Sequence, residues 1–235
     1  MTPQTRPAWV PKPFVRALWV ATGESPGWIL ERTNAFTEQL QRLFGVGSWR
    51  TMDGGPWGGT REEQTQILLG TVYVNDAYEP PRPEPESGYR LLLRGHGPGM
   101  DTDVSVVAGA STTGGRVPAH YLTVDIRELV PGTVGSEAAD ALCAAVISTW
   151  EPAALKLTDS VTNSMARRGN WKIGVGYRTW ISAMVGVIGH AAEGLTVTEV
   201  SGGTMISAPD DWPAQRVVEA LLETLSAKGL DEVPH

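Results

Sequence analysis

The chain has 235 residues, of which 41% are hydrophobic and 19% are charged, so it holds enough apolar material for one large folded domain. Its formal net charge of −7 argues against a binder of nucleic acid or of anionic membranes, because such proteins normally carry a basic field. No stretch approaches the roughly 18 apolar residues of a membrane span, and the N-terminus lacks an apolar signal region. We therefore expect a cytoplasmic protein.

The single cysteine has an apolar setting. Cys143 is the only cysteine, so an intrachain disulfide or a cysteine-rich zinc site is excluded. Its neighbours in residues 141–147 are apolar, and burial disfavours the reactive thiolate. We expect a buried structural thiol on a helix.

The chain begins with an arm, a strand and a helix. Residues 1–12 contain three prolines and are expected to form a flexible arm ahead of a single domain over residues 13–235. A strand is predicted over residues 14–21. A helix is predicted over residues 26–44, because Ser25 is a good N-cap, Pro26 suits the first helical position and Gly45 ends the run.

Two loops of unusual composition follow this helix. Residues 47–59 hold five glycines and two tryptophans and are expected to lack regular structure, with Trp57 exposed. Thr60 is expected to cap a short helix that ends near Gly70. Residues 75–87 hold four prolines and are predicted to form an exposed loop with four acidic residues, Asp76, Glu79, Glu84 and Glu86.

The remaining elements predict an α+β fold. Strands are expected over residues 89–94, 103–108 and 119–126, and their short links favour antiparallel pairing. A helix over residues 136–149 should stop before Pro152, and residues 195–207 read as a hairpin around a Ser-Gly-Gly turn. A last helix begins at Asp210 or Asp211 and ends at Gly229. We predict one mostly antiparallel mixed sheet packed with about three to four helices.

One short motif suggests a serine hydrolase. Residues 23–27 fit the Gly-x-Ser-x-Gly nucleophile elbow, and Ser25 could act with Asp125 and His190. However, the motif follows the first strand, no oxyanion-hole HGGG segment is present, and Ser25 already serves as a helix cap. We therefore expect no enzyme activity and no catalytic residues, and we keep the hydrolase as the alternative.

Metal, cofactor and nucleotide sites are poorly supported. His96, Asp101, Asp103 and His120 are residue types that bind metals. Yet His120 alternates in phase with the apolar positions that follow it, which predicts a hydrogen-bonded core histidine. The glycine pairs form no dinucleotide-binding or Walker loop. We expect neither a metal nor a cofactor.

Several short motifs occur in a characteristic order from about residue 13 to residue 228. They are Glu24-Ser25, Trp49, Asn75-Asp76, residues 87–93 leading into 103–107, Trp150-Glu151-Pro152, residues 176–182 and residues 202–206. In this order they resemble the family catalogued as immunity protein 52, from bacterial polymorphic toxin systems. The chain departs from that pattern at Trp180, where a tyrosine is expected, and in the glycine-rich loop at residues 54–59.

The resemblance implies an α+β fold and a non-catalytic protein that binds and neutralises a cognate toxin, often a restriction-endonuclease-like nuclease. It transfers no catalytic residues. An acidic inhibitor would be steered to the basic cleft of such a nuclease and block it. We expect the toxin-binding residues to be Trp57 as an exposed anchor, with Asp76, Glu79, Glu84, Glu86, Asp101 and Asp103 as the negative face.

Other interpretations stay open at this stage. The acidic side chains could be merely solvated, with Trp57 packed in the protein. A stand-alone small-molecule binding domain would need a large apolar pocket. The sequence does not define the oligomeric state.

Overall fold

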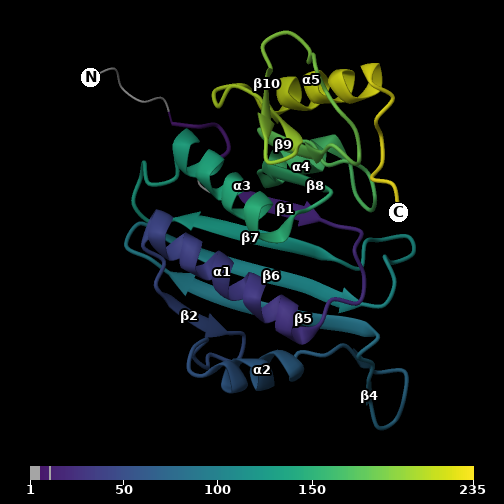
Figure 1. The fold of residues 1–235 in the computed structure, drawn as a ribbon. Helices are drawn as coiled ribbons and strands as arrows, with labels where there is room; N and C mark the ends of the chain where they lie inside the picture. The colour runs from purple at the N-terminus through teal and green to yellow at the C-terminus, as the bar shows by residue number, and fades with distance from the viewer. Residues whose placement is uncertain (1–5, 11) are drawn as a thin grey trace.

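The computed structural model describes residues 6–10 and 12–235, and a large antiparallel sheet organises it (Figure 1). The strands are β1 (Phe14–Leu18), β2 (Ser48–Thr51), β5 (Ser87–His96), β6 (Met100–Ala110), β7 (Tyr121–Glu128), β8 (Ala154–Thr158), β9 (Arg178–Ser182), β10 (Thr196–Val200) and β11 (Gly203–Ser207). Their order across the sheet is β10-β11-β9-β8-β1-β7-β6-β5-β2, and each neighbouring pair is antiparallel. The predicted α+β class is confirmed.

The N-terminal strand joins the two halves of this sheet. In β1, Val15 pairs with Val124 of β7 on one side and with Leu157 of β8 on the other. Strands β5, β6 and β7 form one meander, whereas β8, β9, β11 and β10 extend the sheet on the other side. The predicted hairpin at residues 195–207 is therefore an edge of the sheet rather than its centre.

Five helices pack against the sheet in the described residues. They are α1 (Pro26–Phe44), α2 (Arg61–Leu69), α3 (Ser136–Trp150), α4 (Ser160–Ala166) and α5 (Ala214–Ala227). Helix α1 begins as predicted, because the Ser25 hydroxyl accepts a hydrogen bond from the backbone N–H of Trp28 at 3.2 Å, and it ends at Gly45 with φ 69°. Among the described residues, none of the helices combines the length and the apolar character needed to cross a bilayer.

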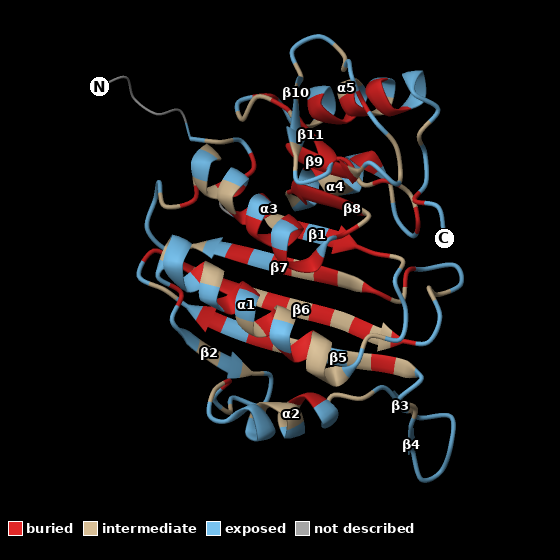
Figure 2. Cartoon of the chain, viewed as in Figure 1, coloured by how far each residue is buried: buried red, intermediate tan, exposed pale blue. Residues whose placement is uncertain are grey.

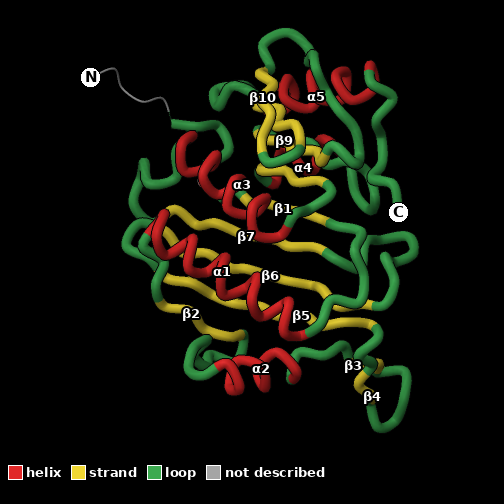
Figure 3. The backbone as a smooth tube through the Cα atoms, viewed as in Figure 1, coloured by secondary structure: helices red, strands yellow, loops and turns green. Residues whose placement is uncertain are grey.

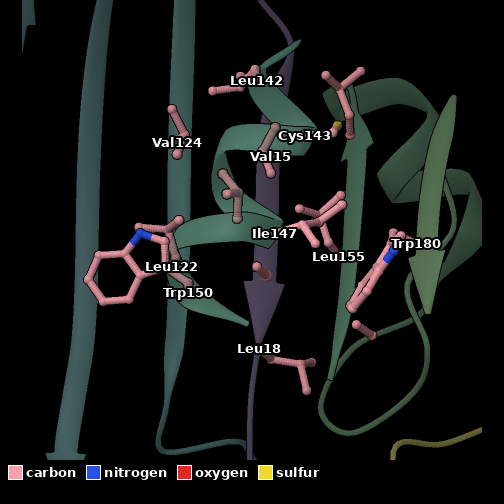
Figure 4. Close-up of a cluster of buried hydrophobic side chains, with 14 of the residues drawn as sticks. Val15, Leu18, Leu122, Val124, Leu142, Cys143, Ile147, Trp150, Leu155 and Trp180 are labelled. Atoms are coloured by element: carbon pink, nitrogen blue, oxygen red, sulfur yellow. The ribbon is translucent and has the colours of Figure 1, made fainter. Parts of the chain in front are cut away.

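The core lies between the sheet and helices α1 and α3, which run side by side over one face (Figure 1). From α3, Cys143, Ile147 and Trp150 point towards side chains of β1, β7 and β8 (Figure 4). Cys143 is fully buried, and this burial raises the pKa of its thiol to about 12. The expected structural role of this thiol is confirmed.

The two halves of the sheet are covered differently. Strands β8, β9 and β11 are buried at nearly every position; α3 packs on β8, and Lys156 of β8 contacts Asn163 of α4, which packs against α5. In β6 and β7 buried and partly exposed residues alternate (Figure 2). Val104 and Val106 face α1, whereas Asp103 and Ser105 face the opposite side. We call this opposite side of β1, β7, β6 and β5 the open sheet face, because no described helix lies across it and α2 only borders it.

The prediction that residues 47–59 lack regular structure is wrong for residues 48–51, and β8, α4 and β9 were not predicted. Residues 48–51 form β2, where the ring of Trp49 lies over Gly95 so closely that a Cβ there would come within 2.7 Å of it. The segment after Trp150 contains β8 and α4, and residues 178–182 form β9. Tertiary pairing overrides the high glycine content in the first case and the absence of alternation in the others.

Part of the predicted N-terminal arm is held on the domain. Trp9 is buried, and its indole N–H donates to the carboxylate of Asp210 at 3.2 Å. Arg6 forms an ion pair with Glu128 at 2.7 Å. The prediction of a flexible arm is therefore wrong for residues 6–10, while residues 1–5 and 11 lie outside the described residues.

Candidate functional site

A small hairpin projects from the body beyond β5 (Figures 1 and 3). It contains strands β3 (Val74–Asn75) and β4 (Arg82–Pro83), which pair antiparallel, and we call residues 73–86 the acidic hairpin. Backbone hydrogen bonds attach its base to β5, since the N–H of Tyr73 donates to the carbonyl of Gly88 at 2.9 Å. The predicted acidic loop is thus an ordered projection.

The exposed part of the acidic hairpin combines carboxylates with aromatic rings. Asp76, Glu79 and Glu86 are exposed, and none of their carboxylates is hydrogen-bonded to another described side chain. Tyr73 and Tyr78 are 51% and 47% exposed, respectively. Large rings that are half exposed beside free charges are typical of contact surfaces in protein complexes.

Glu84 has a different role from the other acidic residues of the hairpin. Its carboxylate accepts hydrogen bonds from the amide of Asn75 at 2.7 Å and from the hydroxyl of Ser87 at 3.2 Å. Both contacts brace the base of the hairpin. We therefore assign Glu84 to the hairpin's structure rather than to its contact surface.

The prediction that Trp57 is an exposed anchor is wrong. Its side chain is only 7% exposed, and its indole N–H donates to the side-chain oxygen of Asn34 at 3.1 Å. Asn34 also binds the side chain of Gln64 at 2.8 Å, so Trp57 lies where the glycine-rich loop, α1 and α2 meet. The ring anchors the loop from within.

Asp101 and Asp103 do not belong to the same surface as the acidic hairpin. They lie on β6 opposite His96 and Arg94, near the end of β5 that is remote from Ser87. Ser87 and His96 are nine strand positions apart, or about 30 Å. One negative surface that includes both groups is therefore excluded by the fold.

The carboxylates of Asp101 and Asp103 are also paired within the protein. Asp103 accepts a hydrogen bond from Arg94 at 2.9 Å. Asp101 binds Arg127 and lies 2.9 Å from Nδ1 of His96. The hydrogen bond from Arg127, together with the contact to His96, lowers the pKa of Asp101. These charges are largely compensated, so they offer little to a basic partner.

The residues of the hydrolase alternative lie apart. Ser25 caps α1 on the covered face of the sheet, whereas the side chain of Asp125 faces the open sheet face. His190 lies in the exposed loop between β9 and β10. The structure does not assemble these three side chains into a triad.

The residues considered for a metal site also separate. His120 is buried in the core, as predicted, and its Nε2 lies 3.0 Å from the carbonyl of Thr112. His96 and Asp101 instead face the open sheet face. Among the described residues, no three His, Cys, Asp or Glu side chains are placed to hold one metal ion.

Sequence reasoning missed two parts of the candidate surface. The first part consists of Tyr73 and Tyr78, which flank Asp76. Aromatic residues in a segment without apolar periodicity could have indicated that their rings are exposed. The second is a groove in the open sheet face, about 1540 Å³ in volume, between the sheet, α2 and the glycine-rich loop. It depends on strand order, which the sequence does not reveal.

No protein-family model and no curated protein matches the chain. Among solved structures, a Pseudomonas aeruginosa protein described as T6SS protein PA0821 aligns with 83% of this chain and 68% of its own, with 10% identity and a TM-score of 0.43. The resemblance to the immunity protein 52 family stays a prediction.

Proposed function

We propose that this chain is a non-catalytic immunity protein that binds a cognate bacterial toxin and neutralises it by blocking its active cleft. The toxin would be a restriction-endonuclease-like nuclease, and the complex would form in the cytoplasm. The resemblance in motif order supports the proposal. The observation that carries it is the acidic hairpin, a projection with three free carboxylates and two half-exposed tyrosines.

The hairpin suits the chemistry of a nuclease cleft. Such a cleft presents basic residues that bind phosphate, so Asp76, Glu79 and Glu86 would steer the inhibitor towards it and raise the association rate. Tyr73 and Tyr78 would supply contact area, since buried tyrosines often account for a large part of binding energy. The projection of the hairpin from the sheet would let it enter a concave site.

The experiment measures binding to the product of the reading frame that adjoins this gene, tested as the candidate toxin. The variant carries Asp76→Lys, Glu79→Lys and Glu86→Lys. A matched control carries Glu38→Lys, Glu199→Lys and Glu223→Lys, three exposed acids on α1, β10 and α5 with the same total change of charge.

We expect the hairpin variant to weaken binding at least about tenfold, mostly through slower association, and to flatten its salt dependence. The control should change neither. Tyr78→Ala should add about 1 to 2 kcal/mol of lost affinity, seen as faster dissociation. Unchanged affinity and salt dependence in the hairpin variant would exclude the hairpin as the contact surface. Absence of binding by the unaltered protein would exclude the function.

A further inference from the structure

The groove in the open sheet face brings together two arginines and a tyrosine from three strands. Arg16 lies on β1, Arg90 on β5 and Tyr121 on β7, and all three line the groove. The guanidinium of Arg16 lies over the Tyr121 ring, 5.0 Å from its centre. Arg90 donates to the Tyr121 hydroxyl from 3.4 Å. Two cations therefore converge on one ring.

Within the part of the chain that the structure describes, neither of these arginines has an anionic partner. Among the described residues, no carboxylate lies within 4.0 Å of the guanidinium of Arg16 or Arg90. Farther along the same face, Arg94 pairs with Asp103 and Arg127 pairs with Asp101. At one end of the open sheet face the arginines are thus paired with carboxylates, whereas at the other end Arg16 and Arg90 are not.

A third cation adjoins Arg16. Lys156 of β8 is the register partner of Arg16 and is only 6% exposed. Its ammonium group donates to the side-chain oxygen of Asn163 at 2.6 Å, and no described carboxylate forms an ion pair with it. Burying a charge without a counterion destabilises the folded protein, so the positive charge gathered around Arg16 lowers its stability.

The three carboxylates that line the groove form no ion pair with Arg16 or Arg90, although Asp125 is only two positions along β7 from Thr123, the register partner of Arg16. Asp53 accepts hydrogen bonds from Thr51 and from the N–H of Gly55. Glu63 closes the capping box of α2. Asp125 lies opposite Asp103, towards the end of the face where charges are paired.

We propose that this groove binds an acidic segment of a protein partner, whose carboxylates pair with Arg16 and Arg90 on either side of Tyr121. Arginine binds carboxylates through two parallel hydrogen bonds, which favours such pairing. Met52, 81% exposed, and Ile67 border the same groove and provide contacts for an apolar side chain of that segment.

Size and overall charge favour a protein segment over other anions. A volume of about 1540 Å³ exceeds the roughly 300 to 1,000 Å³ of a typical small-molecule pocket. The net charge of −7 repels a nucleic acid, which carries a phosphate at every nucleotide, more strongly than a protein segment with only a few carboxylates. The proposal does not depend on the function of the acidic hairpin.

The test uses the full chain and a fluorescent twelve-residue peptide made of glutamates with one central leucine. Fluorescence anisotropy measures its binding at low and at physiological salt. The test variant is Arg16→Glu with Arg90→Glu, and the matched control is Arg42→Glu with Arg116→Glu, two exposed arginines outside the groove. The variant Arg16→Gln with Arg90→Gln removes the charges alone if the reversal impairs folding.

We expect saturable binding by the unaltered chain, at least tenfold weaker binding by both groove variants and no change in the control. A peptide with glutamine in place of glutamate should not bind. The proposal is overturned if the unaltered chain does not bind the peptide, if the control variant loses as much affinity as the groove variants, or if the glutamine peptide binds equally well. Tighter binding of a twelve-nucleotide thymidine strand would also overturn it.

Discussion

The carboxylate of Glu24 lies 3.2 Å from Nδ1 of His120 in the interior of the protein, where both side chains are almost fully buried. Despite this short distance, Nδ1 of His120 has no hydrogen-bond partner among the described residues. Glu24 also accepts hydrogen bonds from the indole of Trp19 at 2.7 Å and from the N–H of Gly109 at 3.1 Å. This one carboxylate therefore joins the segment before α1 to strands β6 and β7.

Glu24→Gln should lower the free energy of unfolding by about 2 to 4 kcal/mol at pH 7, because it leaves His120 and the buried donors poorly paired. Urea unfolding monitored by tryptophan fluorescence measures this. Burial acts to raise the pKa of Glu24, but His120, the backbone N–H of Glu24 and the indole of Trp19 outweigh this effect and lower the pKa.

A lowered pKa makes the effect of Glu24 depend on pH. The unfolded chain binds the proton more readily, so the contribution of Glu24 is present above its ordinary pKa and is lost as the pH falls through the lowered value. The difference between the two proteins should therefore shrink in acid below about pH 4.3. A difference that grows in acid would contradict this role.

Arg178→Met should destabilise the protein by about 3 to 5 kcal/mol. Arg178 is buried on β9 and binds Asp140 of α3 at 2.5 Å, Asp210 at 2.9 Å and Ser136 at 2.7 Å. Its removal takes one donor from each of these groups and from the carbonyls of Tyr177 and Ala208, and it leaves Asp210 with the indole N–H of Trp9. Arg178→Lys should recover only part of the loss, since an ammonium group cannot match the planar fork. Arg116→Met, at an exposed position, serves as the control in thermal unfolding.

Lys156→Met should instead stabilise the protein, by about 1 to 3 kcal/mol at pH 7. Desolvation, with the nearby charges of Arg16 and Arg168, lowers the pKa of Lys156 to about 8. The unfolded chain therefore holds this proton over a pH range in which the folded chain has lost it. The stability of the unaltered protein should rise from about pH 8 to about pH 10.4, and the advantage of the variant should shrink there. Urea titrations at pH 7 and pH 10 measure the stability difference between the two proteins and its change with pH. A variant that is less stable than the unaltered protein at pH 7 would refute the prediction.

Ser25→Ala should cost about 0.5 to 2 kcal/mol of stability through the lost cap of α1. It should leave the proposed toxin binding unchanged, because the Ser25 hydroxyl accepts a hydrogen bond from the N–H of Trp28 and lies apart from Asp125 and His190. Ser25→Asp keeps a capping side chain and should restore the stability. Loss of a measurable hydrolase activity in both variants would favour the hydrolase alternative instead.

Local signals in the sequence were sufficient for some elements. The cap, proline and terminal glycine that bound α1 act within the helix itself, so its predicted limits agree with the structure. Strands β8 and β9 were missed because both of their faces are buried and both carry charged residues, Lys156 and Arg178. Such strands lack alternation, and their polar groups are satisfied only by α3, α4 and the segment at Asp210.

By itself, the sequence determined the fold class, the limits of α1 and the existence of an exposed acidic segment, because composition and caps act over a few residues. Only the tertiary structure decided which charges are free. Trp57 is buried where its indole N–H donates a hydrogen bond to Asn34, a residue of α1 that lies 23 positions earlier in the chain. Arg16 and Arg90 meet at Tyr121 because strand order brings β1, β7 and β5 onto one face, and the charge excess there exists only once the sheet has formed.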